Sequence, residues 1–339
     1  EGAQGARAMR ILEQENYYNV INGYKSLFLE REATDVLDEK YKEGTTFNEV
    51  YALYCFDREV RTIYLKFLLK LENSIKTVIA HEFSSVYGHD NYLKLSNFQS
   101  TVSTDTSDLK YIAKTHRLDM LKDIDEIRRI SAEENAEAVI KLIGDIHQEL
   151  ARQMGKHHNV VTHYMTQHGY IPLWVLVKVL SFGIVSELYT VLKKEDRFAI
   201  CDYYGIEPED YANYLPILAN YRNLCAHEDI LFCNRTQRVI SDTAYHRMLN
   251  IEKTNDEYIY GKNDLFALII IMRQLLSQTE VTNLIIEIDK AISNLEFNIK
   301  SIPINKVLNE MGFPENWKDI ASIRKWKIWK IKYLIFLQY

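Results

Sequence analysis

Apolar residues recur three or four positions apart over long stretches of the chain, a spacing that is typical of amphipathic helices. The longest such stripe predicts a helix over about residues 47–86, ended near Gly88, and Thr46 followed by Glu49 has the spacing of a capping box. The stripe comprises Leu53, Phe56, Val60, Ile63, Phe67, Leu71, Ile75 and Val78. With only 5 Pro and 12 Gly in the chain, the pattern predicts an all-α fold.

The remaining pattern predicts further helices separated by loops. Residues 97–109, rich in Ser, Thr and Asp, predict a loop. The further helices are expected over about 116–155, 172–193, 195–204, 208–228, 263–277 and 279–297. We expect an N-terminal segment over 1–46, a helical domain over 47–235 and a C-terminal helical region over 236–339.

Composition narrows the classes of function. A chain of 339 residues that is 47% hydrophobic can bury a substantial core. Its net charge of −6 argues against a uniformly basic surface that coats nucleic acid, although it permits a local basic groove. Its four cysteines form no CxxC pair, which disfavours a zinc ribbon or a disulfide framework and favours the cytoplasm. The most apolar windows, 171–185 and 265–272, are too short to span a membrane.

The two ends of the chain carry patterns of their own. The opening EGAQGARAMR lacks the apolar core of a signal peptide and is left out of the fold prediction, with a cloning remnant as one interpretation. At the other end, basic and apolar residues alternate from Arg324 to Lys332. An RNA-binding extension, a membrane-surface segment and an apolar stretch docked on the core are all open for this tail.

The stretch YRNLCAHEDILF (221–232) brings together Arg222, Asn223 and His227, here called the polar trio. On a helix, Asn223 and His227 face the same way and Arg222 lies about 100° round from Asn223. The opposite side carries Leu218, Tyr221, Leu224 and Cys225. We therefore expect the trio to point away from the core.

These three side chains suit RNA cleavage without a metal or another cofactor. Imidazole moves protons near neutral pH, guanidinium holds a phosphate and its developing charge, and the ribose 2′-hydroxyl supplies the nucleophile. The spacing alone also fits a surface histidine beside an arginine paired with Glu228 or Asp229.

Four segments in order resemble the Abi family of phage abortive-infection proteins, the AbiD/AbiF-like group of the HEPN superfamily. The segments are GTTFNEVYALYCFDREVR (44–61), IPLWVLVKVLSFG (171–183), YRNLCAHEDILFCNR (221–235) and MGFPENW (311–317), and the resemblance runs from about 17 to 317. It implies a HEPN-type helical bundle with additional N- and C-terminal helical segments, metal-independent endoribonuclease activity, a toxin-like antiviral role and an RNA partner such as a structured non-coding RNA. It further implies that Arg222 stabilises the scissile phosphate, that His227 transfers a proton or binds phosphate, and that Asn223 orients either of them.

The resemblance to HEPN proteins also implies that two such motifs come together face to face. An enzymatic form of the protein is therefore expected to be a homodimer. Within the chain, Lys76 and His81 repeat the five-residue spacing, with Asn73 beside them and Glu72 one turn before Lys76. A second catalytic half, an RNA-contacting or supporting group and a plain surface ion pair are open readings here. Lysine lacks the bidentate fork of arginine, which disfavours the first.

Other candidates carry weaker signals. Four histidines lie within KHHNVVTHYMTQH (156–168), but their spacing fits no metal site, and we interpret them as loop or helix-end residues near an RNA path. Trp174 is interpreted as a packing residue, together with Val177, Leu180 and Phe182. NYYNVINGYK (16–25) mixes aromatic, amide and lysine side chains, as RNA-contacting surfaces do.

The sequence thus predicts an RNA-cleaving protein. A catalytically silent RNA-binding protein and, third, a scaffold that senses phage components are the alternatives.

Overall fold

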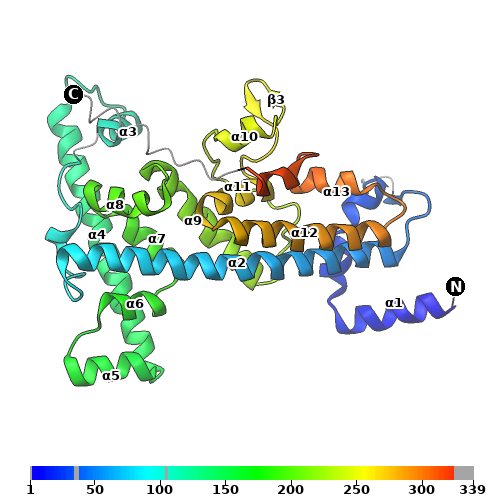
Figure 1. The fold of residues 1–339 in the computed structure, drawn as a ribbon, viewed down its shortest axis with the longest axis horizontal. Coiled ribbons are helices and arrows are strands. Elements are labelled where there is room, and N and C mark those ends of the chain that lie inside the picture. Colours follow the sequence, from blue (N-terminus) through cyan, green and yellow to red (C-terminus); the bar gives the residue numbers. More distant parts are fainter. Residues whose placement is uncertain (1, 34–37, 104–105, 324–339) are drawn as a thin grey trace. The chain divides into compact units, whose positions relative to one another are not determined.

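The computed structural model describes residues 2–33, 38–103 and 106–323, and helices dominate these residues (Figure 1). They fall into two compact units. The first unit runs up to Leu69 and resumes at Asn220, and the second unit is Lys70–Ala219. The prediction of an all-α fold is confirmed, with two small antiparallel hairpins as the strands of the described residues. The predicted domain boundaries at 46/47 and 235/236 stay a prediction.

Helix α2 (Phe47–Tyr87) is the long helix that the apolar stripe predicts, and it crosses from the first unit to the second. At its start the Glu49 carboxylate accepts from the Thr46 amide at 3.0 Å, as a capping box requires. The same carboxylate accepts from the amides of Lys300, at 2.5 Å, and Ser301, at 2.7 Å. Glu49 therefore ties the start of α2 to a segment about 250 residues later.

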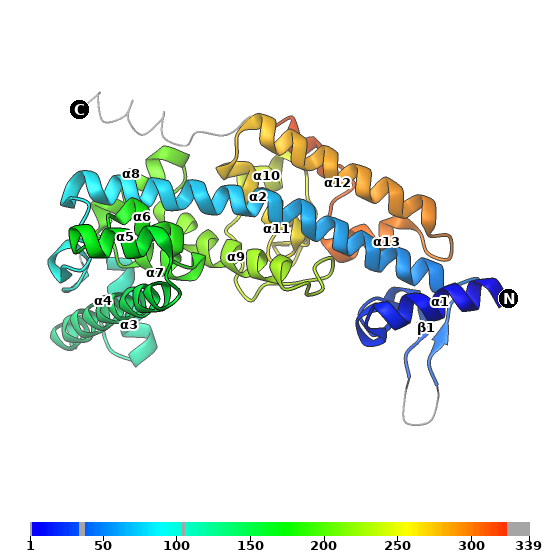
Figure 2. The ribbon, with the colours of Figure 1, turned by 90° about the horizontal axis from the view of Figure 1, so that it is seen from below.

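The first unit builds its core around α11 (Leu265–Leu275) and α12 (Gln278–Asn298), which contact each other (Figure 2). The side chains of α11 are buried almost without exception, and its N-cap Asp264 accepts from the Ala267 amide at 2.9 Å. The remaining elements of the first unit are α1 (Gly2–Gln14), η1 (Tyr18–Asn22), η2 (Lys25–Phe28), β1 (Leu29–Arg31), β2 (Lys40–Tyr41), α10 (Ala244–Met248), β3 (Lys253–Thr254), β4 (Glu257–Tyr258), α13 (Ile304–Met311) and η4 (Trp317–Ala321). None of the helices in the described ranges is long and apolar enough to cross a membrane.

The second unit is arranged around α4 (Ile124–Gly155), which contacts α3 (Thr106–His116), α5 (Asn159–His168) and α7 (Phe182–Thr190). The other elements of this unit are η3 (Leu95–Asn97), α6 (Leu173–Val179) and α8 (Lys194–Tyr204). Helix α9 (Pro208–Ala226) begins in this unit and ends in the first.

Three predicted boundaries are wrong. The expected helix over 172–193 is two helices, because the chain is extended at Leu180 and Ser181, and the Ser181 hydroxyl accepts from the Ile184 amide at 3.2 Å as the N-cap of α7. The loop expected up to 109 gives way to α3 at Thr106. The charged helix expected from 116 begins only at Ile124.

Candidate functional site

The polar trio lies at the end of α9, the helix that the sequence predicts. Pro208 opens this helix, where its missing amide costs nothing, and Glu209 and Asp210 place negative charge in the first turn. The predicted inner side is confirmed as buried, with Leu218, Tyr221, Leu224 and Cys225 each less than 9% exposed. The trio therefore lies at the end of a helix whose opposite side is packed in the protein interior.

Within the trio, Asn223 and His227 are exposed and Arg222 is half-buried. The Arg222 guanidinium donates from Nη1 to Oδ1 of Asn223 at 3.3 Å. This contact orients the planar guanidinium, a group whose fork of donors suits phosphate oxygens. The structure thus brings Arg222 and Asn223 together, with His227 one turn further along the same side.

The helix ends at the motif itself. The His227 amide donates to the Asn223 carbonyl at 2.9 Å, and the Asp229 amide donates back to the Leu224 carbonyl at 3.3 Å. Between them Glu228 adopts a left-handed conformation with φ of 60°. The Asp229 bond is the 6→1 bond of a Schellman motif, with a glutamate at the left-handed position where glycine is usual. His227 is consequently held at the last turn by backbone geometry.

A buried charged pair on α2 holds the segment that follows this turn. The Asp57 and Arg61 side chains are 0% and 4% exposed, and their charged groups lie 2.6 Å apart. Arg61 donates to the Asp229 carbonyl at 3.1 Å, only two residues past His227. The pair is separated from this segment by about 170 residues of sequence, so it fixes the motif through tertiary structure.

The Asp57 carboxylate also receives three neutral donors. The Leu231 and Phe232 amides donate to it at 3.1 and 2.7 Å, and the Tyr24 hydroxyl donates at 2.7 Å. Burial raises the pKa of Asp57, and the hydrogen bonds and the Arg61 charge oppose this rise. Burial and the neighbouring carboxylate raise the pKa of Tyr24, so its hydroxyl stays protonated and donates.

Asp57 and Arg61 lie in a segment that carries the family resemblance, but the sequence pattern assigned a role to neither residue. A signal was present. Asp57 lies among apolar positions of the stripe, with Leu53 four before it and Val60 three after it, both buried. A carboxylate on the apolar side of a helix with an arginine four residues later predicts a buried ion pair.

The group Glu72, Asn73, Lys76 and His81 lies in the second unit, whereas the polar trio lies in the first. The Lys76 ammonium is buried and bonds Glu72 at 2.7 Å and the Leu180 carbonyl at 2.8 Å. This ion pair is therefore internal and does not lie on the surface. Asn73 and His81 are exposed, and His81 Nδ1 lies 3.0 Å from Glu82. The proposed RNA-binding or catalytic roles of these residues stay predictions.

The remaining candidates are placed as follows. No metal-ligand cluster is formed by the His, Cys, Asp and Glu residues of the described ranges. Val177, Leu180 and Phe182 are buried as predicted, but the prediction for Trp174 is wrong, because its side chain is 50% exposed. In 16–25, Tyr17 and Tyr18 are exposed while Tyr24 is buried. The basic tail 324–332 lies outside the described residues.

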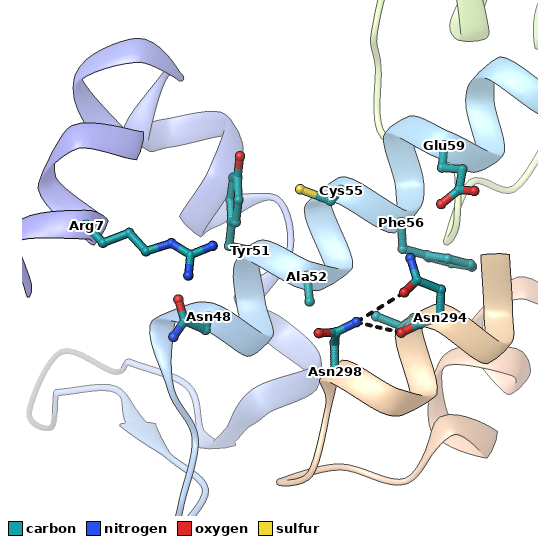
Figure 3. Close-up of a pocket in the computed structure, with 10 residues that line it drawn as sticks. Arg7, Asn48, Tyr51, Ala52, Cys55, Phe56, Glu59, Asn294 and Asn298 are labelled. Atoms are coloured by element: carbon teal, nitrogen blue, oxygen red, sulfur yellow. Dashed lines mark hydrogen bonds between the residues drawn. The ribbon is translucent and has the colours of Figure 1, made fainter. Parts of the chain in front are cut away.

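A cavity of about 340 Å³ in the first unit is lined by α1, α2 and α12 (Figure 3). Figure 3 shows Arg7 reaching toward Asn48 and Tyr51, and Asn298 donating to Asn294. The thiol that lines the cavity is that of Cys55. Burial raises the pKa of this thiol, which disfavours the nucleophilic thiolate. The cavity has hydrogen-bonding groups but no imidazole among its lining residues, so it does not compete with the trio as a proton-transfer site.

Comparison with known proteins gives one finding. A family model described as Abi-like protein matches residues 10–233, which is more than half of the chain and includes the polar trio, Asp57 and Arg61. The matched range ends before MGFPENW (311–317). No curated protein and no solved structure matches the chain.

Proposed function

The chain belongs to the Abi-like protein family, and from this membership we propose that it is a HEPN-type, metal-independent endoribonuclease that acts on RNA in the cytoplasm during abortive infection. One observation carries the proposal. A guanidinium, an amide and an imidazole are presented together at a helix end that a buried ion pair fixes in place.

The proposed reaction uses the RNA as its own nucleophile. The 2′-hydroxyl oxygen attacks the adjacent phosphorus and gives up its proton, the bond from phosphorus to the 5′-oxygen breaks, and that oxygen takes a proton. The products are a 2′,3′-cyclic phosphate and a 5′-hydroxyl end. Arg222 stabilises the extra negative charge on the phosphoryl oxygens, His227 carries one of the two protons, and Asn223 holds the guanidinium.

One trio supplies one imidazole, whereas the reaction moves two protons. We therefore propose that two chains pair about a two-fold axis and face their trios toward one substrate. The buried state of Lys76 supports this arrangement over a second half-site within the chain, because its ammonium is engaged with Glu72 and Leu180.

A second candidate follows if the chain stays monomeric. A single trio can hold phosphates without cutting, as in a stable ribonucleoprotein with a structured non-coding RNA. Arg222 and Asn223 then serve as phosphate and sugar ligands.

Induction in cells separates the two candidates. The wild-type chain, Arg222→Ala and His227→Ala are expressed in parallel, growth and RNA ends are followed, and the RNA that co-purifies with each protein is sequenced. We expect growth arrest and new RNA ends with the wild type alone. If RNA stays uncut with all three proteins, and a discrete bound RNA is lost only from Arg222→Ala, the nuclease proposal is contradicted and the non-cleaving RNA-binding protein is favoured.

A further inference from the structure

The second unit carries a connected cluster of six rings, here called the ring cluster, that the proposed site does not use. Successive members have centroids 5.2 to 6.3 Å apart. The members are His89, His163, Tyr164, His168, Tyr170 and Trp174. They come from the loop after α2, from α5, from the segment that leads into α6 and from the first turn of α6.

The ring cluster is exposed rather than buried. Trp174 is 50% exposed and Tyr170 37% exposed, and His163 and His168 are exposed as well. Neighbouring rings are tilted or perpendicular, with interplanar angles from 39° to 84°, so no ring lies flat against its neighbour. Exposed aromatic faces of this kind are costly in water unless a partner covers them.

Hydrogen bonds hold the rings in place. His89 Nε2 lies 3.0 Å from the Tyr170 hydroxyl, and the Leu173 amide donates to the His89 carbonyl at 2.8 Å. Beside them the buried Tyr92 hydroxyl donates to the Ile171 carbonyl at 2.8 Å. The chain from Tyr170 to Leu173 is therefore tied to the segment that follows α2, and the rings of His89 and Tyr170 are positioned before any ligand arrives.

Charge indicates which partner fits. The chain has 47 Asp and Glu residues among 339, yet none lies between Glu149 and Glu187, the stretch that contains five of the six rings. The same stretch contains Lys156 and Lys178, both exposed, and Lys178 lies one turn after Trp174 on α6. The nearest acidic residue in sequence to the sixth ring is Asp90, beside His89. Because five of the six rings lie in a stretch without acidic residues, in a chain of net charge −6, the ring cluster favours an anionic partner.

We propose that the ring cluster binds single-stranded RNA by stacking two or more bases on Trp174 and its neighbouring rings, with Lys178 near the phosphates. Bases of a single strand offer their faces to aromatic and imidazole rings, and a duplex does not. The inference rests on the proposed function for its choice of RNA, and it adds a surface that recognises unpaired bases separately from the polar trio.

Binding is measured by fluorescence anisotropy on a labelled 2′-O-methyl oligonucleotide of mixed sequence, single-stranded or annealed to its complement. This RNA lacks the attacking hydroxyl, so its binding is independent of cleavage and the outcome is distinguishable from failure of the proposed function. Trp174→Ala and His168→Ala are compared with Trp174→Phe, which keeps a ring. The matched control is Tyr111→Ala, since Tyr111 is 70% exposed in the same unit and belongs to no ring pair of the cluster.

We expect Trp174→Ala and His168→Ala to weaken single-strand binding about tenfold each, Trp174→Phe to keep most of it, and Tyr111→Ala to leave it unchanged. The duplex is expected to bind more weakly than the single strand. Equal affinity in Trp174→Ala, His168→Ala and Tyr111→Ala, a preference for duplex, or no binding by the wild type would overturn the inference. Trp174-dependent binding to vesicles of phosphatidylserine without RNA binding would overturn it in favour of a membrane surface.

Discussion

The guanidinium of Arg61 lies 3.1 Å from the backbone carbonyl of Asp229, while its other partner, Asp57, lies 2.6 Å away in the interior. Through this bridge, a helix early in the chain holds the turn that carries His227. A buried ion pair adds little net stability when both partners are present, but losing one partner is expensive. Asp57 and Arg61 are therefore best understood as positioning residues for the polar trio.

Asp57→Asn is expected to lower the free energy of unfolding by about 3–5 kcal/mol, because it leaves the Arg61 charge buried without a counter-charge. The neighbouring Arg58→Ala is the matched control. Arg58 also binds a carboxylate, Glu15, at 2.9 Å, but its side chain is 40% exposed, so a change below about 1 kcal/mol is expected. Urea denaturation of the three proteins measures both effects. Equal losses in the two variants would contradict the energetic importance of the buried pair relative to an exposed one.

The buried Asp264 predicts a specific dependence of stability on pH. Burial raises its pKa to about 6, with the amide donors of the α11 N-terminus opposing the shift. An unfolded aspartate has a pKa near 3.9. The folded state thus holds this proton more tightly, and its contribution is complete below about pH 4 and lost as pH rises through 6.

Asp264→Asn tests this sign. The amide can still accept at the N-cap but carries no charge, so the stability of the wild type relative to the variant should fall by roughly 2 kcal/mol between pH 4 and pH 7. Thermal or urea unfolding over that range measures the difference. A difference that stays constant or rises with pH contradicts the assignment.

Gly312 is expected to tolerate no side chain. Its φ is +76°, and a Cβ there would lie 2.2 Å from the Asp264 carboxyl group. Gly312→Ala should destabilise the protein by more than about 1 kcal/mol. Gly144→Ala, in the interior of α4 with no atom within 4 Å of the added methyl, should instead stabilise it by about 0.5–1 kcal/mol. If Gly312→Ala and Gly144→Ala were both more stable than the wild type, the close approach of Gly312 to the Asp264 carboxyl group would be refuted.

The proposed dimer predicts a dominant effect of an inactive chain. When wild type is re-associated with a ninefold excess of His227→Ala, cleavage per wild-type chain should fall about tenfold, because nearly every wild-type chain then faces an inactive trio. Arg58→Ala, which leaves the trio intact, serves as the mixing control. Unchanged cleavage per wild-type chain would mean that one trio acts alone.

Local patterns in the sequence predicted the elements that those patterns decide. The apolar stripe of α2 and the inner side of α9 follow from spacing, because burial of one helix side is all that they require. The break at Ser181 was missed because a continuous apolar run, here 171–185, hides a change of direction. Its signal was a serine cap, which is weaker than the hydrophobicity around it.

The residues of the candidate site also fall into those that local sequence patterns predict and those that they do not. Arg222, Asn223 and His227 share one helix, so spacing placed them together. Asp57 and Arg61 act on that helix from far away in sequence, and no local pattern reports such a contact. Trp174 was misplaced because a tryptophan within an apolar run has the same sequence pattern whether it packs inward or outward.

The central claim is that the polar trio cuts RNA. The most direct measurement is single-turnover cleavage of a defined RNA by purified wild type, Arg222→Ala, His227→Ala and Arg58→Ala in the presence of EDTA, with the chemistry of the new ends determined. We predict 2′,3′-cyclic phosphate and 5′-hydroxyl ends from wild type and Arg58→Ala, and losses of about 10²–10⁴-fold in both trio variants. Wild-type rates in either trio variant, or cleavage of an RNA that carries 2′-O-methyl groups throughout, would contradict the account.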